Sequence, residues 1–145
     1  KIDKYVDGKK NALVAIKSSE NDVDIIHSSK ADLIFSFEEN SRKEFMHQRA
    51  SGFNQVMAKL AKDTGTMVGF SFRDMLMGKE KGVILGRIMQ NMGLCRKFEV
   101  VNVVASFAHH PFEMGSSHDV VTLFKYLGFN DVCFLNSNML DKHQP

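Results

Sequence analysis

The chain has 145 residues, of which 43% are apolar and 25% are charged, values typical of a single soluble globular domain. No apolar run approaches the roughly 18 residues that a membrane span needs, and the start at Lys1, without an initiator Met or a signal-peptide pattern, indicates a fragment or a trimmed product. The net charge of +2 does not by itself indicate a nucleic-acid-binding protein.

Four segments are predicted to be β-strands. Their apolar residues form nearly continuous runs rather than a strict alternation, which is typical of strands buried on both faces of a parallel sheet. The predicted strands are Ala12–Lys17, Asp32–Phe37, Thr66–Phe72 and Val100–Phe107.

Helical patterns fall between these strands. A weaker one covers Asp22–Ser29, between the first two strands. From Phe53 to Ala61 the apolar residues recur at helical spacing, and we expect Ser51 to cap this helix and Gly65 to end it.

A longer helix is predicted over Lys79–Phe98. A last helix begins at Ser116, whose spacing to Asp119 resembles a capping box, and ends at Gly128. The tail after Asn130 has two interpretations, because Val132–Leu135 fits either a last strand or a short helix. The apolar stripe of the longer helix comprises Ile84, Ile88, Met92 and Cys95, and places the Cys95 thiol in the core, where a reduced, unreactive cysteine is expected.

The regular alternation of strand and helix predicts a βα-repeat fold with right-handed crossovers. A Ser-Phe pair recurs at Ser36, Ser71 and Ser106, a constant step of 35 residues, close to the roughly 31 residues of one unit in an eight-fold barrel. Each serine closes a predicted strand. We therefore expect the three hydroxyls to line the carboxyl end of the sheet, where such folds usually place function.

The predicted fold class is α/β, a TIM-barrel-like βα-repeat domain spanning residues 1–145. Only four to five strand–helix units fit in this length, whereas a closed eight-stranded barrel needs about 250 residues. The barrel is therefore incomplete or truncated, or else the sheet is open.

Charge is unevenly distributed along the chain. Between Arg42 and Lys97 there are eleven basic and four acidic residues, a net charge of +7, and the remaining residues carry −5. This middle segment indicates either a surface that faces a polyanion or lysines and arginines that merely solvate two helix exteriors. We expect Arg73 on the rim of the sheet, directly after a strand, and Arg87 on the solvent side of its helix.

The common enzyme fingerprints are absent: the sequence has no Walker loop, GxSxG, HExxH or CxxC. One lead toward catalysis is a set of possible metal ligands after the fourth strand, which would make the protein a metal-dependent phosphoesterase. This set is His109, His110, Glu113 and His118-Asp119, with Glu38 and Glu39 as carboxylates at a matching level. Against it, metal sites of barrels draw their ligands from several strand ends, and the other strands offer few.

Several stretches together resemble one protein family. They are RASGFNQVMAKLA at 49–61, VGFSFRDML at 68–76, ILGRIMQN at 84–91, PFEM at 111–114 and His118-Asp119. This combination is similar to ribonuclease P protein component 3, the p30-type subunit of archaeal and eukaryotic ribonuclease P. The resemblance runs from about residue 31 to residue 128, and the archaeal branch is nearer.

The resemblance implies a TIM-like barrel related to phosphoesterases of the polymerase–histidinol phosphatase type. It also implies a protein subunit that binds the catalytic RNA and supports removal of the 5′ leader from precursor tRNA. The RNA and its Mg²⁺ ions would perform catalysis, so no catalytic residue, metal site or cofactor is expected on this chain.

The expected partners are ribonuclease P RNA, component 2 in a heterotetramer, other ribonuclease P proteins and, indirectly, precursor tRNA. The expected location is the cytoplasm of an archaeal cell, or the nucleus and nucleolus of a eukaryotic one. No membrane is expected to be involved.

The resemblance matches Arg49, Arg73 and Arg87 to basic residues of the family, and we expect them to bind RNA. Charge alone adds Arg42, Lys43, Arg96 and Lys97 to this set. Members of the family are usually longer, and residues 129–145 are only loosely similar to them, so the first barrel strands and a C-terminal segment are expected to be missing.

Overall fold

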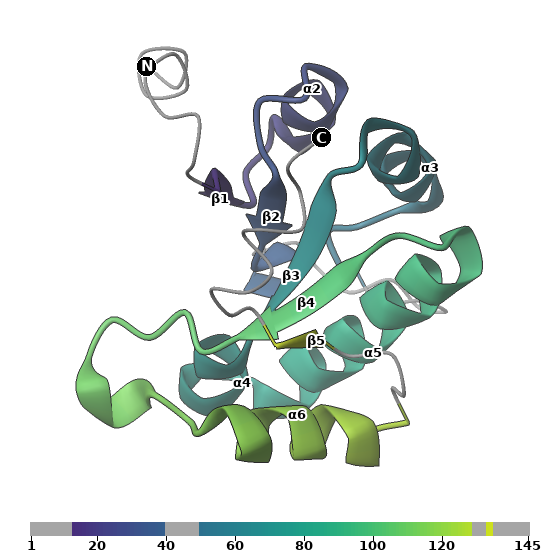
Figure 1. Cartoon of the computed structure of the whole chain (residues 1–145). Coiled ribbons are helices and arrows are strands. Elements are labelled where there is room, and N and C mark those ends of the chain that lie inside the picture. The colour runs from purple at the N-terminus through teal and green to yellow at the C-terminus, as the bar shows by residue number, and fades with distance from the viewer. Residues whose placement is uncertain (1–12, 40–49, 129–132, 135–145) are drawn as a thin grey trace.

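The computed structural model describes residues 13–39, 50–128 and 133–134 (Figure 1). Five parallel strands form one sheet in the order β1-β2-β3-β4-β5. The strands are β1 (Ala15–Lys17), β2 (Leu33–Phe35), β3 (Met67–Ser71), β4 (Asn102–Ala105) and β5 (Cys133–Phe134). The helices are α2 (Asp22–His27), η1 (Phe37–Glu39), α3 (Gln55–Thr64), α4 (Phe72–Met77), α5 (Lys81–Phe98), η2 (Pro111–Glu113) and α6 (Ser117–Tyr126).

The strand order identifies the architecture. Each strand pairs with the next one along the chain, so every crossover moves the sheet in the same direction, whereas the order reverses in a doubly wound sheet. The helices follow one another along one side of the curved sheet in Figure 1. The predicted class is confirmed: this is an α/β fold consistent with part of a TIM-like barrel. None of the described helices is both long and apolar enough to cross a bilayer.

The register of the sheet agrees with barrel geometry. Phe35 pairs with Gly69, and Ser71 pairs with Ala105, so partners in β2 and β3 and in β3 and β4 lie 34 residues apart. The serine step of 35 residues exceeds this spacing by one residue per strand. In an eight-stranded barrel with a shear of about 8, neighbouring strands are likewise offset by about one residue on average.

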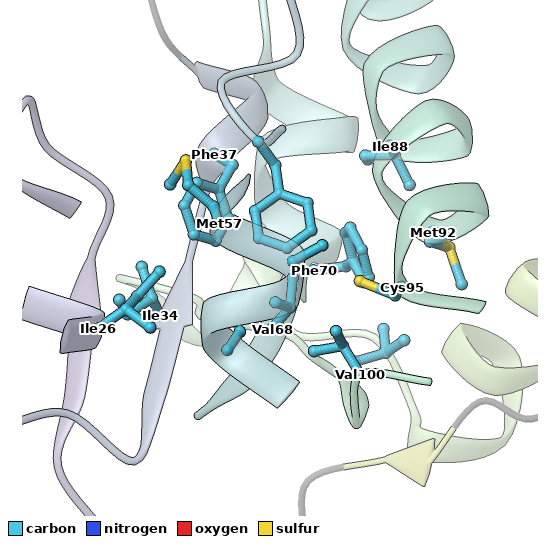
Figure 2. Packing of buried hydrophobic residues seen from close by; sticks show 14 of the residues in the cluster. Ile26, Ile34, Phe37, Met57, Val68, Phe70, Ile88, Met92, Cys95 and Val100 are labelled. Atoms are coloured by element: carbon cyan, nitrogen blue, oxygen red, sulfur yellow. The ribbon is translucent and has the colours of Figure 1, made fainter. Parts of the chain in front are cut away.

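The two faces of the sheet carry different cores. Ile34, Val68 and Phe70 face the helices and belong to the main apolar cluster, shown in Figure 2. Leu33, Met67 and Val103 form a smaller cluster on the opposite face. Every residue of β3 is buried, as expected for a strand covered on both sides. The prediction is wrong for the first strand, because Ala15 and Lys17 of β1 are exposed.

Gly69 allows the aromatic rings on this second face to sit close to the sheet. Phe35 and Phe107 stack with their ring centroids 4.0 Å apart. A Cβ atom at Gly69 would lie 2.9 Å from the Cβ of Phe35, closer than packed side chains approach. A larger residue at this position would displace the stack.

The predicted helices are confirmed with small changes at their ends. The α5 stripe of Ile84, Ile88, Met92 and Cys95 is buried. Gly65 ends α3 with a left-handed φ of 74°. Ser51 does not cap α3, because Asn54 does: its side-chain oxygen accepts from the Met57 N–H at 2.9 Å.

The main element missed from the sequence is α4. The third strand was expected to continue to Phe72, but Phe72 begins a helix. The side chain of Ser71 accepts from the Asp74 N–H, as that of Ser116 accepts from the Asp119 N–H at the start of α6. The same Ser-x-x-Asp signal was present at both places. In the tail, the strand interpretation is confirmed for residues 133–134.

Candidate functional site

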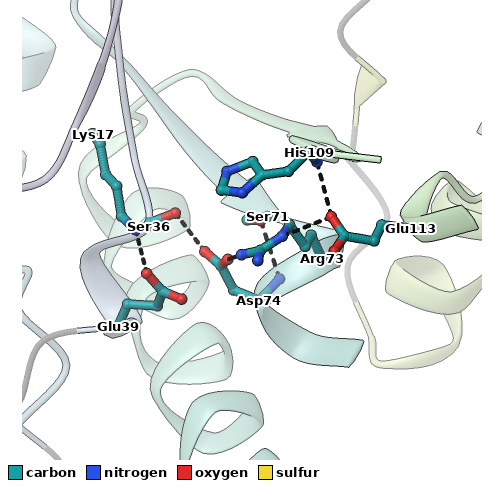
Figure 3. Close-up of polar contacts among 8 residues, drawn as sticks. All are labelled: Lys17, Ser36, Glu39, Ser71, Arg73, Asp74, His109 and Glu113. Atoms are coloured by element: carbon teal, nitrogen blue, oxygen red, sulfur yellow. Dashed lines mark hydrogen bonds and ion pairs between the residues drawn. The ribbon is translucent and has the colours of Figure 1, made fainter. Parts of the chain in front are cut away.

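The carboxyl end of the sheet gathers the three repeated serines around the first turn of α4. The Ser36 hydroxyl donates to an Asp74 carboxylate oxygen (Figure 3), and the Ser71 hydroxyl accepts from the Asp74 N–H at 3.2 Å. Ser106 takes part through its backbone carbonyl, which accepts from the Arg73 N–H at 3.1 Å. The prediction is confirmed for the Ser36 and Ser71 hydroxyls, which converge on Asp74, a residue that the sequence patterns did not single out.

Two residues at this edge have left-handed backbone. Ser36 after β2 has φ of 62° and Phe107 after β4 has φ of 45°, although neither is glycine. Such a conformation costs on the order of 1 kcal/mol per residue. At Ser36 the hydrogen bond to Asp74 offsets this cost, so the turn after β2 depends on the contact with α4.

Arg73 lies on the rim of the sheet, as expected, but its guanidinium is already engaged. Its Nε donates to Glu113 Oε2 at 2.8 Å, and its Nη1 lies 3.5 Å from Asp74 Oδ1. The same Glu113 oxygen accepts from the His109 backbone N–H at 2.8 Å. The hydrogen bond from the His109 N–H, followed by the contact with Arg73, lowers the pKa of Glu113 below its ordinary value, although partial loss of solvent contact opposes the shift. Arg73 therefore joins α4 to the segment that follows β4.

Glu38 is the second acidic residue at this edge. It is fully buried, and within the described part of the chain neither of its carboxylate oxygens has a hydrogen-bond partner. Burial, together with the nearby charge of Asp74, raises the pKa of Glu38 to about 8. Burial also raises the pKa of Asp74, against the hydrogen bond from Ser36. Glu38 is therefore protonated at neutral pH.

The turn that contains Glu38 is held from two sides. Lys17, at the end of β1, forms an ion pair with Glu39 (Figure 3). The Nη1 of Arg87 in α5 donates to the Glu38 backbone carbonyl at 2.9 Å. The carboxyl end of the sheet is thus connected to β1, α4 and α5.

The position of Arg87 corrects a prediction. We expected this residue to remain available to solvent, but it is 6% exposed. Arg87 lies three residues after Ile84 and four before Asn91, so helical spacing places it on the buried stripe of α5. Asn91, on the same stripe, donates from its amide to the Ser51 carbonyl at 3.0 Å. The polar residues of this stripe hold neighbouring loops.

Within the described ranges, the predicted RNA-binding residues do not form one surface. Arg73 lies at the carboxyl end of the sheet, whereas Arg96 and Lys97 are exposed in the last turn of α5, which leads to the amino end of β4. Arg42, Lys43 and Arg49 lie outside the described residues.

A second group of cations lies at the amino end of the sheet. Lys62, in the last turn of α3, is exposed there, together with Arg96 and Lys97 of α5. Lys62 Nζ lies 3.3 Å from Glu99 Oε2, which places the ends of the two helices side by side. Cations in the last turn of a helix also offset its dipole, so part of this charge stabilises the helix ends.

The possible metal ligands do not converge. His109, His110 and His118 are exposed, and Glu113 is bound to Arg73. Over the described ranges, no three His, Cys, Asp or Glu side chains come together as a metal site would require.

Fold and site together define an α/β protein of the βα-repeat class. Polar side chains from several elements are joined by hydrogen bonds and ion pairs at the carboxyl end of its parallel sheet, which forms a polar edge. Three curated proteins named ribonuclease P protein component 3 are similar to it. The protein from Methanosarcina acetivorans is 28% identical over 85% of this chain, and that from Methanosarcina mazei is 29% identical over 90%. The protein from Methanosarcina barkeri is 27% identical over 76% of this chain.

The chain spans about half the length of these curated relatives, covering 54% of the first two and 48% of the third. No protein-family profile matches it. A half-length match agrees with a sheet that contains part of a barrel.

Proposed function

We propose that this chain is part of a p30-type ribonuclease P protein and supports RNA-catalysed removal of the 5′ leader from precursor tRNA. The observation that carries this proposal is that three relatives with the same name match between 76% and 90% of the chain. The parallel βα-repeat fold agrees with the barrel expected for that family. Component 2, other ribonuclease P proteins and the catalytic RNA are the proposed partners.

The polar edge suits a subunit that provides structure rather than chemistry. Asp74 is bound by Ser36 and Ser71, and Glu113 by Arg73 and His109. These groups hold neighbouring loops in place. In the proposed particle, the RNA and its Mg²⁺ ions supply catalysis, and the protein side chains organise the RNA.

The strongest candidate for the RNA-binding surface is the amino end of the sheet. Arg96 and Lys97 are exposed there, near the end of α3 where Lys62 pairs with Glu99, and exposed cations neutralise phosphates without needing a fixed geometry. Arg73 is a weaker candidate, because phosphate would compete with Glu113 for its guanidinium. Arg42, Lys43 and Arg49 remain in the proposal on sequence grounds. Arg87 is reassigned as a structural residue because it is buried.

Reconstitution tests the proposal directly. The RNA and protein components of the Methanosarcina mazei particle would be combined with this chain in place of component 3, and leader cleavage and RNA retention would be measured. We expect the chain to bind the RNA and to raise cleavage above that of the particle lacking component 3. The Arg96→Ala/Lys97→Ala variant should lose part of this effect, and Lys125→Ala, which alters an exposed lysine of α6, should not. A chain that neither binds the RNA nor changes cleavage would contradict the proposal.

A further inference from the structure

The segment between β4 and α6 presents apolar side chains to solvent. It includes η2 and projects beyond the carboxyl end of the sheet in Figure 1. Phe112, within η2, is 99% exposed, and Met114 is 65% exposed. A phenylalanine this exposed buries almost no surface against the described part of this chain.

This projecting segment is fixed at several points. Glu113 accepts from Arg73 and from the His109 N–H, each at 2.8 Å. Two backbone hydrogen bonds close the turn, from the Glu113 N–H to the His110 carbonyl at 3.0 Å and from the Met114 N–H to the Pro111 carbonyl at 3.2 Å.

Gly115 fixes the far side of the segment. A Cβ atom at this position would lie 2.7 Å from the Phe72 ring and 2.8 Å from a Val120 methyl group. The backbone therefore packs directly against α4 and α6, in a space that no side chain fits. Together with the bonds of Glu113, this contact holds Phe112 outward before any partner binds, which lowers the entropic cost of association.

Local charge indicates the class of partner. Residues 107–119 contain no Lys or Arg, and they include the acids Glu113 and Asp119. The nearest arginine, Arg73, is already paired with Glu113. RNA-binding surfaces combine aromatic residues with cations that neutralise phosphates, whereas protein interfaces are enriched in Phe and Met and poor in lysine.

We propose that residues 111–114 dock onto a protein, with Phe112 entering an apolar pocket of another ribonuclease P protein subunit and Met114 packing beside it. The inference rests on the proposed function, which names the particle in which the partner is found. It assigns protein binding to the projecting segment at the carboxyl end of the sheet and leaves the exposed cations at the amino end for RNA.

The test uses the other purified protein subunits of the Methanosarcina mazei particle, each titrated with this chain in the absence of RNA. Phe112→Ser should weaken binding to one of them by roughly 30-fold, the loss typical of a buried aromatic anchor. Tyr126→Ser is the matched control, since Tyr126 is 89% exposed on α6, away from the segment, and it should leave the affinity unchanged. Glu113→Ala keeps Phe112 but loosens the turn, and should give an intermediate loss.

Each result leads to a different conclusion. Equal affinity of Phe112→Ser and the unmodified chain for every subunit would overturn the inference. If Phe112→Ser instead weakens binding to the RNA alone, Phe112 stacks on a nucleobase, and the protein assignment is wrong. A chain that binds the RNA but no protein subunit overturns the inference and leaves the proposed function standing. A chain that binds neither overturns both.

Discussion

The two ends of the sheet use similar charged residues in opposite ways. At the carboxyl end, Arg73 and Asp74 are bound to neighbouring elements, and Glu38 is fully buried. At the amino end, Arg96 and Lys97 are exposed, and Lys62 forms an ion pair with Glu99 at the surface. Arg73, Asp74 and Glu38 therefore stabilise the fold at the carboxyl end, whereas Arg96 and Lys97 remain exposed at the amino end.

This difference shows why net charge alone does not locate a binding surface. Of three arginines in the basic middle of the chain, Arg96 is exposed, whereas Arg73 is half-buried and paired and Arg87 is buried. Substitutions at the two ends should accordingly affect different measurements, stability at the carboxyl end and RNA affinity at the amino end.

The largest effect is expected from Glu38→Gln. Glu38 ionises near 4.5 in the unfolded chain but near 8 in the folded protein. Between these pH values the folded state binds more protons, so the unfolding free energy of the unmodified chain falls as pH rises and levels off above about 8. Glutamine stays neutral, so the variant should be more stable at pH 8, on the order of a few kcal/mol.

Denaturant unfolding between pH 5 and pH 9 measures this effect, with Glu39→Gln as the control. The side chain of Glu39 is 31% exposed and paired with Lys17, so this variant should keep the pH dependence of the unmodified chain. If Glu38→Gln retains that dependence as well, Glu38 is not protonated in the folded state.

A smaller loss is expected from Arg87→Met. The methionine retains an unbranched apolar chain but leaves the Glu38 carbonyl without its donor, which should lower the unfolding free energy by about 1–3 kcal/mol. Arg96→Met, in the exposed last turn of the same helix, should change it by less than about 0.5 kcal/mol. Urea unfolding compares the two, and equal losses would mean that Arg87 is not held as the structure shows.

The serine caps give a finer comparison. Ser71 and Ser116 each accept from the N–H of an aspartate three residues later, at 3.2 Å and 3.1 Å, but Ser71 is buried and Ser116 is exposed. Ser71→Ala should therefore cost about 1–2 kcal/mol, and Ser116→Ala nearer 0.5 kcal/mol. Thermal unfolding measures both, and the opposite order would show that water replaces the Ser71 cap without cost.

The smallest change in free energy is expected at the amino end. Arg96→Ala/Lys97→Ala should weaken binding to ribonuclease P RNA several-fold and reduce the slope of log affinity against log salt by about 2, one for each lost phosphate contact. Its thermal unfolding should change only slightly, through the lost interaction of the two cations with the dipole of α5. An unchanged salt slope would remove this surface from the RNA interface.

Much of the fold follows from local patterns in the sequence. Continuous apolar runs identify β2, β3 and β4, and the spacing from Ile84 to Cys95 identifies the buried stripe of α5. The serine step places three strand ends at one edge, because the repeat length of a βα unit fixes where each strand stops.

The site is less predictable, because its contacts join residues distant in sequence. Ser36 meets Asp74 across 38 residues, and Arg73 meets Glu113 across 40. No local pattern encodes these pairs. Arg87 was misplaced for a different reason: its charge suggested exposure, although its spacing from Ile84 placed it on the buried stripe. Where charge and spacing conflict, the spacing of the helix is the better guide to orientation.

The burial of Cys95 provides a way to observe opening of the main core. This cysteine is free and buried, and burial raises the pKa of its thiol to about 12. Thiolate is the form that reacts with alkylating reagents, so the folded protein should be almost inert at Cys95 near neutral pH. Each alkylation event at this residue then requires α5 to separate from the sheet, and its rate reports how often that separation occurs.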